Sequence, residues 1–258
     1  MIAAGCDVGS LTAKAVLMNN GDIIAAEVVR AKGGPEESAR MVMDAALAKA
    51  GLSMEDIGLC VGTGYGRKQI PFVDAVESEI VCHGKGAVWQ APDVRTIVDI
   101  GGQDCKAIRI DDTGNVARYV YNDRCASGTG RFLEIIAEAL EIGLEEMGDI
   151  DARAENHLTL SHQCVVFAET EIISLVNQGV AIPDIVAALH RAVAGRAASL
   201  ARGIGVEQRV AMSGGVAKNE GMFRALAAAL GVELVRLNNP QITGALGAAL
   251  IAAERIDG

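Results

Sequence analysis

"DVGSLTAKAV" at residues 7–16 and "DIGGQDCKAI" at residues 99–108 lie over one another when the chain is shifted by 92 positions. The positions identical in both stretches are Asp7 and Asp99, Gly9 and Gly101, Lys14 and Lys106, and Ala15 and Ala107. Each copy predicts an apolar strand that ends in an acid, a glycine-containing turn and a second strand, with a later turn before a third strand. This internal repeat predicts two similar halves with a cleft between them.

Composition and charge restrict the class of protein. The chain has 258 residues, of which 50% are apolar, enough to bury a large core. No apolar run reaches about 18 residues, and "MIAAGCDVGS" has no basic flank, so we expect no membrane span, no signal peptide and a cytoplasmic location. The net charge of −10 disfavours nucleic-acid binding, and six cysteines in such a chain favour reduced thiols, metal ligation or burial over disulfides. These features direct attention to small-molecule chemistry.

The turn after Asp7 has the features of a phosphate-binding loop. Glycine lets backbone amides approach an anion closely, the hydroxyls of Ser10 and Thr12 add hydrogen bonds, and Lys14 supplies positive charge. We expect the carboxylates of Asp7 and Asp99 to hold a hydrated Mg²⁺ between the halves. The alternative is that D-x-G only forms hairpin turns; that interpretation would be preferred for either copy alone, and the duplication favours phosphate binding.

Two later segments support nucleotide binding. "VAMSGGVAKN" at 210–219 predicts a strand, then Gly214 and Gly215, then a helix, and the backbone there can approach a nucleotide. "LNNPQITGALGAAL" at 237–250 predicts a loop and a terminal helix, with Gln241 facing an adenosine. The alternative is that both segments are ordinary strand-to-helix connections.

These motifs together resemble a known superfamily. The D-x-G-S, D-I-G-G-Q-D and S-G-G spacing is similar to that of the actin, Hsp70 and sugar-kinase superfamily of ATPases. Within it, "VGTGYGR", "DIGGQDCKAI", "NDRCASGTGRFLE", "CVVFAETEIIS" and "GALGAAL" resemble the activators of 2-hydroxyacyl-CoA dehydratases and the related ATPase subunits of benzoyl-CoA reductase. The resemblance runs from about Gly5 to Ala252.

The resemblance implies an α/β fold, the two-lobed actin-like ATPase fold (a duplicated ribonuclease H-like unit) with a nucleotide cleft between the lobes. We expect an N-terminal lobe at 1–93 and a C-terminal lobe at 94–258 that carries Cys125 and Cys164. The terminal helix is expected to return to the first lobe. Helices are predicted at 35–51 and 183–205, from their caps and amphipathic spacing.

Cys125 in "NDRCASGTGRF" and Cys164 in "SHQCVVFAETEIIS" each stand at the entrance to a predicted helix. Amides at a helix N-terminus stabilise a thiolate, the form that binds metal. Two cysteines cannot fill the four positions of a [4Fe–4S] cluster, whereas a homodimer supplies four. The resemblance implies the same, because in that family one cluster bridges two subunits through the cysteines that correspond to these two. The alternative is that both are buried cysteines.

The remaining cysteines and histidines receive no catalytic role. We expect Cys6, Cys60 and Cys105 to be buried in strands. Cys82 stands beside His83, but adjacent residues are poor geometry for one metal ion, so a buried or surface role is favoured. No chemistry is assigned to His157, His162 and His190, because they lack partners at a ligand spacing.

On this basis we expect an ATP-dependent electron donor. Reduced by ferredoxin or flavodoxin, the homodimer would bind ATP and pass one low-potential electron from its cluster to an acyl-CoA dehydratase or related reductase component, with ATP hydrolysis giving direction. The expected catalytic residues are Asp7, Asp99 and either Gln103 or Asp104, which would orient the attacking water. The expected nucleotide-binding residues are Gly9, Ser10, Leu11, Thr12, Ala13, Lys14, Gly101, Gly102, Gly214, Gly215 and Gln241, and the expected metal ligands are Cys125 and Cys164.

Three other functions are compatible with parts of the pattern. One is the ATPase subunit of a permanent complex of the benzoyl-CoA reductase type. Another is a small-molecule kinase of the same fold, which leaves the two cysteines unexplained. The third is a nucleotide-gated binding protein of the chaperone type, for which no peptide-binding domain is apparent.

Overall fold

The structure, a computed structural model, describes residues 1–122, 125–160 and 164–258, with residue 257 described by its backbone alone. His162 lies outside the described residues. Two compact units are present. The first comprises Met1–Val94, Ile110–Ala117 and Leu237–Gly258, and the second comprises Arg95–Arg109 and Arg118–Arg236. The division into lobes at residues 93 and 94 stays a prediction.

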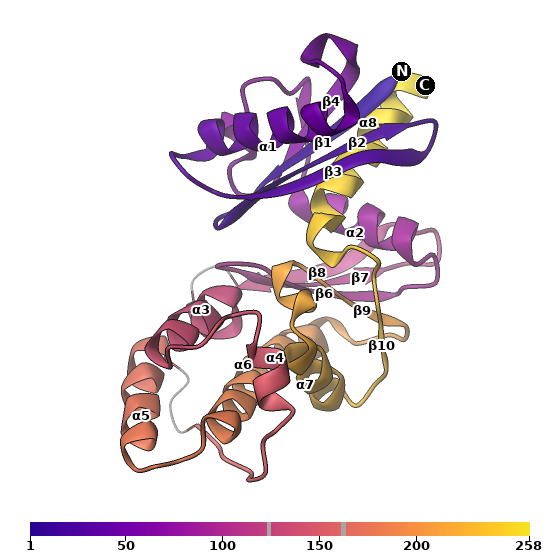
Figure 1. The fold of residues 1–258 in the computed structure, drawn as a ribbon. Coiled ribbons are helices and arrows are strands. Elements are labelled where there is room, and N and C mark those ends of the chain that lie inside the picture. Colours follow the sequence, from indigo (N-terminus) through magenta and orange to yellow (C-terminus); the bar gives the residue numbers. More distant parts are fainter. Residues whose placement is uncertain (123–124, 161–163) are drawn as a thin grey trace. The chain divides into compact units, whose positions relative to one another are not determined.

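The first unit contains a five-stranded sheet with the order β3-β2-β1-β4-β5 (Figure 1). Its strands are β1 (Ile2–Val8), β2 (Thr12–Asn19), β3 (Asp22–Arg30), β4 (Ile57–Thr63) and β5 (Ala75–Val76). The first three are antiparallel neighbours, whereas β4 and β5 run parallel to β1. This confirms the strand, turn and strand predicted around "DVGSLTAKAV".

Helices cover both faces of the first sheet. Alternate residues of β1 belong to separate apolar clusters, one shared with α1 (Pro35–Ala50) and the other with α2 (Glu79–Gln90) and α8 (Thr243–Asp257). The predicted helix at 35–51 is confirmed: α1 starts at a proline and ends at Gly51 in the left-handed conformation. Helix α8 lies so close to β1 that a Cβ on Gly5 would collide with the Ala245 carbonyl. Short 3₁₀ turns complete the unit: η1 (Met54–Asp56), η2 (Arg67–Gln69) and η5 (Pro240–Ile242).

The second sheet repeats the topology of the first. Its strands are β6 (Thr96–Ile100), β7 (Cys105–Ile110), β8 (Val116–Asn122), β9 (Val210–Ser213) and β10 (Leu234–Val235). Their order, β10-β9-β6-β7-β8, matches the first sheet when β6 replaces β1, β7 replaces β2 and β9 replaces β4. The two directions of pairing also match, since β6 is antiparallel to β7 and parallel to β9. The duplication predicted from ten residues therefore extends through a whole sheet.

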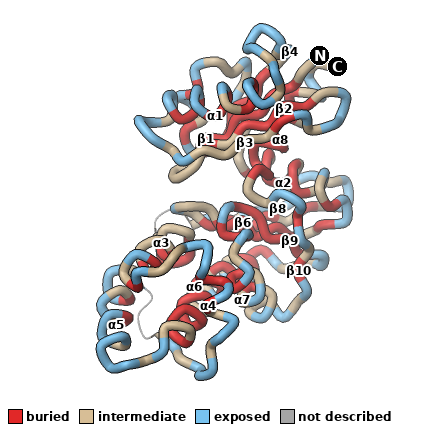
Figure 2. The backbone as a smooth tube through the Cα atoms, viewed as in Figure 1, coloured by how far each residue is buried: buried red, intermediate tan, exposed pale blue. Residues whose placement is uncertain are grey.

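The core of the second unit lies around α6 (Ile182–Ile204), whose inner face is buried along most of its length (Figure 2). The predicted helix at 183–205 is confirmed. The other helices are α3 (Gly130–Ala139), α4 (Met147–Asp151), α5 (Val165–Asn177) and α7 (Glu220–Leu230), with 3₁₀ turns η3 (Ala126–Gly128) and η4 (Gly215–Lys218). Throughout the described part of the chain, no helix combines the length and apolar character needed to cross a membrane.

Candidate active site

The first unit presents an acid and a lysine side by side at the end of its central strand. Asp7 on β1 is opposite Lys14 on β2, and the lysine Nζ lies 3.2 Å from Asp7 Oδ2. The intervening turn is closed by a 3.0 Å hydrogen bond from the Gly9 amide to the Thr12 carbonyl. Nearly all of Asp7 is buried, whereas Ser10 and Thr12 are half-buried. The expected phosphate-loop residues of this unit therefore lie together around one carboxylate.

A second loop lies against the same carboxylate, although its residues were not among the predicted site residues. Thr63, the last residue of β4, is in register with Asp7. Gly64 follows with φ 89°, and a Cβ there would collide with Asp7 Oδ1. Only glycine allows the backbone to pass this close in a left-handed conformation. The "VGTGYGR" motif thus forms one wall of the Asp7 site.

The second unit repeats this arrangement around Asp99. Lys106 on β7 is opposite Asp99, its Nζ lies 3.4 Å from Asp99 Oδ2, and it also forms an ion pair with Asp104. The lysine is only 3% exposed. On the other side, Ser213 Oγ donates a 2.8 Å hydrogen bond to Asp99 Oδ1. Asp99 is therefore a buried carboxylate held between an ammonium group and a hydroxyl group.

The residues that follow Asp99 differ in their exposure and in the bonds that they form. The Asp104 side chain is engaged by Lys106, and the Gly101 amide donates a 2.9 Å hydrogen bond to the Asp104 carbonyl. Gln103 is exposed. Gly101 and Gly102 are half-buried in the turn between β6 and β7.

The segment Ser213–Asn219, called the S-G-G loop here, is the counterpart of the "VGTGYGR" wall. Ser213 is in register with Asp99 as Thr63 is with Asp7. Gly214 has φ 87°, and a Cβ there would lie 3.0 Å from Asp99 Oδ1 and collide with the Ile100 carbonyl. Gly214 is buried, whereas Gly215 is exposed at the start of η4. Gln241, also expected to contact the nucleotide, lies half-buried in η5 of the first unit.

Cys125 lies directly before η3, and its thiol is partly accessible. Its Sγ lies 3.1 Å from Ser127 Oγ. Hydrogen bonds from Ser127 lower the pKa of this thiol, and the charge of Arg196 adds to the effect. The helix predicted after Cys125, α3, starts only at Gly130, so its first residue is five positions away from the cysteine. The hydroxyl and amide of Ser127, rather than the start of α3, stabilise the thiolate at this position.

Cys164 is exposed and directly precedes α5, as predicted. The exposed surface of α5 carries large apolar side chains, of which Val166 is 67% exposed. The others are Phe167, Ile173 and Val176. Among the residues described, no group of three or more His, Cys, Asp or Glu side chains is arranged to hold a metal ion.

The other four cysteines are buried: Cys6, Cys60, Cys82 and Cys105. Burial raises the pKa of Cys60 and of Cys82 to about 12, and it also raises the pKa of Cys6 and of Cys105. The expectation of buried thiols is confirmed for the three strand cysteines. Of the buried and surface positions considered for Cys82, the structure shows the buried one. A neutral, desolvated thiol is a poor metal ligand.

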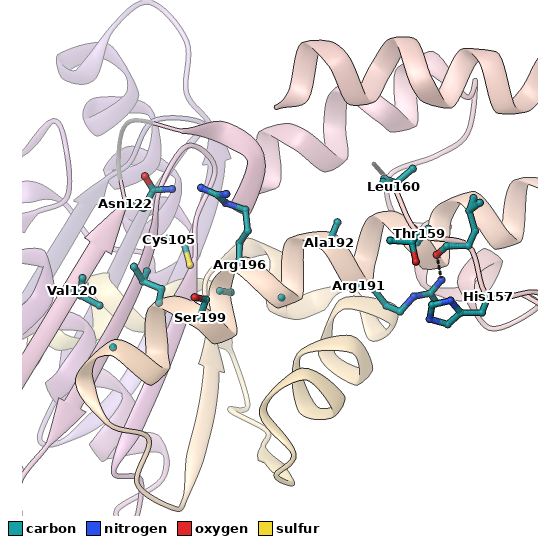
Figure 3. A pocket seen from close by; sticks show the side chains of 17 residues that line it. Cys105, Val120, Asn122, His157, Thr159, Leu160, Arg191, Ala192, Arg196 and Ser199 are labelled. Carbon is teal, nitrogen blue, oxygen red and sulfur yellow. Dashed lines mark hydrogen bonds between the residues drawn. The ribbon is translucent and has the colours of Figure 1, made fainter. Parts of the chain in front are cut away.

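A cavity of about 810 Å³ lies beside α6 in the second unit (Figure 3). Arg196, Asn122 and Cys105 line one end of it. At the other end Arg191 donates a 2.7 Å hydrogen bond to the Leu158 carbonyl. Asn122 Nδ2 also donates to the Cys125 carbonyl, 3.1 Å away, so the first end of the cavity adjoins the Cys125 backbone.

Known proteins are similar to this chain over most of its length. The model of the BadF/BadG/BcrA/BcrD ATPase family matches residues 4–252. An activator of lactoyl-CoA dehydratase from Anaerotignum propionicum is 48% identical over 255 residues, which are 98% of each chain.

Solved structures agree with the sequence comparison. The activator of the 2-hydroxyisocaproyl-CoA dehydratase from Clostridium difficile, with bound ADPNP, is 42% identical with a TM-score of 0.96, over 100% of this chain and 96% of that one. Component A of the (R)-2-hydroxyglutaryl-CoA dehydratase from Acidaminococcus fermentans is 37% identical with a TM-score of 0.96, over 100% of both chains.

A more distant structure extends the likeness of fold alone. A ROK family glucokinase from Streptomyces griseus has a TM-score of 0.61 at 15% identity, over 98% of this chain and 100% of that one. The expected actin-like α/β fold, shared with sugar kinases, is therefore confirmed. The family match and the relatives lead to the same conclusion, that this chain is a member of the BadF/BadG/BcrA/BcrD ATPase family.

Proposed function

We propose that this chain is an ATP-dependent activator that passes one low-potential electron to a partner of the 2-hydroxyacyl-CoA dehydratase type. One observation carries the proposal: of the six cysteines, only Cys125 and Cys164 are not buried. These two thiols occur in a chain of an ATPase family whose close relatives bear the name of dehydratase activators.

Cys125 and Cys164 fit an iron–sulfur cluster. Soft thiolates are the ligands that iron–sulfur clusters use, and the lowered pKa of Cys125 favours that form near neutral pH. A [4Fe–4S] cluster takes four thiolates, and one chain offers two accessible ones, so we propose that two copies share one cluster. When bound, the cluster would supply one-electron chemistry at low potential.

The apolar surface of α5 supports the homodimer. Its exposed side chains, Val166 and Phe167 among them, follow Cys164 directly. Burying such a surface against a second copy removes apolar area from water and would bring the cysteines of two chains together.

For the ATPase reaction we propose that the duplicated acid sites bind ATP and Mg²⁺. Asp7 and Asp99 offer the carboxylate oxygens that Mg²⁺ prefers, and each has a lysine beside it that can also meet a phosphate. The glycine-containing turns and the S-G-G loop offer backbone amides to the nucleotide. Gln241 offers the amide group of its side chain. Gln103 rather than Asp104 would orient the attacking water, since Asp104 is already paired with Lys106.

The turn that binds phosphate is joined to the segment that carries Cys125. The Gly130 amide donates to the Gly101 carbonyl at 2.9 Å, and the Arg131 amide donates to the Gly102 carbonyl at 2.8 Å. A change in this turn on nucleotide binding or hydrolysis would therefore reach the first residues of α3 and the cysteine five positions before them. This is the route by which we propose that ATP governs electron transfer.

The first experiment measures iron and acid-labile sulfide per polypeptide in protein purified without oxygen, with the mass in solution determined in the same run. We expect two iron atoms per chain in a dimer, and loss of that iron in Cys125→Ser or Cys164→Ser. Protein that stays iron-free after anaerobic reconstitution, yet hydrolyses ATP, would contradict the proposal and favour a kinase of the same fold.

The reductant and the partner are part of the same proposal. Ferredoxin or flavodoxin would supply the electron, and an acyl-CoA dehydratase or related reductase component would receive it. A permanent complex of the benzoyl-CoA reductase type is the second candidate, favoured if the protein purifies bound to its partner at constant stoichiometry.

A further inference from the structure

His190 lies in the middle of α6, and its side chain is 0% exposed. Its Nδ1 lies 2.6 Å from Oδ2 of Asp151, the last residue of α4. Its Nε2 lies 3.2 Å from Nδ2 of Asn219, the residue that caps the N-terminus of α7. One buried imidazole therefore joins three helices of the second unit, although the sequence assigned it no role.

The hydrogen bonds of Asn219 fix the tautomer of this imidazole. Asn219 Oδ1 accepts a 3.0 Å hydrogen bond from the Met222 amide, so the side-chain nitrogen of Asn219 is the atom that faces His190. An amide nitrogen only donates, so Nε2 must accept. The proton of the neutral ring is then on Nδ1, where it is donated to Asp151, and both ring nitrogens are satisfied.

This contact holds one end of the S-G-G loop. At the beginning of the loop, Ser213 is bonded to Asp99, and at its end Asn219 is bonded to His190. Gly221 shows how tightly the second end is packed, because a Cβ there would lie 2.5 Å from His190 Nδ1 and collide with the Asp151 carboxylate. The loop is thus fixed on both sides of its glycines.

We propose that His190 is a positioning residue for ATP, whose Nε2 accepts from Asn219 and so holds the end of the S-G-G loop where its backbone meets the nucleotide. This inference rests on the proposed function, since it takes the loop to contact ATP. Without an acceptor at Nε2, the Asn219 amide would lose this hydrogen bond and the end of the loop would be freed.

The charged groups around His190 keep Asp151 as its carboxylate partner. Asp151 faces it from α4, Arg224 from α7 lies 3.9 Å from Asp151 Oδ1, and Arg191 is next to it on α6. Burial tends to raise the pKa of Asp151, but the hydrogen bond from His190, the charge of that ring when it is protonated, and the two arginines hold the pKa below its usual value. Asp151 is therefore ionised near neutral pH and can accept from Nδ1.

The test is the affinity of the intact, anaerobically purified protein for MgATP, measured by calorimetry. Asn219→Ser keeps an oxygen to cap α7 but removes the amide that meets His190. We expect it to raise the Kd for ATP about fivefold to tenfold, the effect of one buried hydrogen bond.

His190→Gln is the conservative counterpart. Its side-chain oxygen can accept from Asn219 in place of Nε2, so this variant should bind ATP as the wild type does. Rescue by glutamine would show that ATP binding depends on an acceptor at this position.

Asp184→Asn is the matched control. Asp184 is a buried carboxylate on the same helix, and it accepts 2.9 Å hydrogen bonds from the Glu155 and Asn156 amides without contact to the S-G-G loop. It should lower the melting temperature but leave the Kd for ATP unchanged. Wild-type affinity in Asn219→Ser, or equal weakening in Asp184→Asn, would overturn the inference alone. Wild-type protein that binds no ATP would overturn the proposed function as well.

Discussion

The backbone amide of Gly130 donates a 2.9 Å hydrogen bond to the carbonyl of Gly101. The first residue belongs to the start of α3, and the second to the turn that follows Asp99. A Cβ on Gly130 would lie 3.1 Å from that carbonyl and 3.1 Å from the Val216 side chain in the S-G-G loop. The helix that follows Cys125 is therefore in direct contact with two of the segments expected to bind ATP.

Gly130→Val should abolish the coupling between nucleotide binding and the proposed cluster. The branched side chain would push α3 away from the Gly101 turn, since neither backbone can yield without losing its hydrogen bonds. If the proposed coupling is right, ATP should change the electron paramagnetic resonance spectrum of the reduced wild-type protein, and Gly130→Val should keep its iron but show no such change. Gly195→Ala on α6 is the control, because a Cβ there meets nothing within 4 Å. An ATP-induced spectral change of wild-type size in Gly130→Val would contradict this route of coupling.

Asp99→Asn should abolish hydrolysis and keep the cluster. The amide retains the shape of the carboxylate and can still accept from Ser213, but it lacks the charge that Mg²⁺ requires. We expect the rate of ATP hydrolysis to fall about 100-fold or more, with iron per chain unchanged. Phosphate release and iron content are measured on one preparation. Unchanged turnover would remove Asp99 from the mechanism.

Lys106→Met should lower stability as well as activity. Removing the ammonium group leaves two carboxylates, Asp99 and Asp104, near one another without their shared cation. Breaking a buried pair in this way costs about 3 kcal/mol in the free energy of unfolding. The double variant Asp99→Asn with Lys106→Met should recover part of that loss, and strictly additive effects in urea unfolding would show that the pair is not coupled.

The thiol of Cys125 should react at lower pH than an ordinary cysteine. Ser127 lowers its pKa, so more thiolate is present at any pH below the usual titration range. In iron-free protein, iodoacetamide should label Cys125 well before Cys60, whose pKa of about 12 leaves it neutral. Ser127→Ala should move the pH profile of labelling upward. A profile that does not move would mean that Ser127 has no influence on the thiol.

Val166→Glu should prevent the proposed dimer. The change puts a charge on the exposed apolar surface of α5, two residues after Cys164, where a second copy is expected to pack. We expect monomers with little iron, measured by light scattering and metal analysis. Val76→Glu is the control, since Val76 is 47% exposed on β5, far along the chain from Cys125 and Cys164. Iron-loaded dimers of Val166→Glu would exclude this surface as the interface.

Much of the fold was accessible from the sequence because its signals are local. Alternating apolar residues, acids at strand ends and glycines at turns repeat in the two halves, and they predicted both strand pairs. The wall formed by Thr63 and Gly64 was not predicted, because its sequence resembles the S-G-G loop only in beginning with a hydroxyl residue and a glycine. The pairing of Thr63 with Asp7 depends on the register of the sheet, which spacing along the chain does not reveal. His190 was missed because its partner Asp151 is 39 positions away and no spacing rule joins them.

The packing of α8 on β1 has a consequence for how the chain is made. One face of the first sheet includes Ala3, Val16 and Val61, and it is covered by α8, which is translated after the whole second unit. During translation that face has only α2 to cover it until residues 243–257 leave the ribosome. The first unit therefore begins as an unfinished sheet with a partly open apolar side, and it is completed only when α8 has been made. In that period nascent chains depend on chaperones to avoid association.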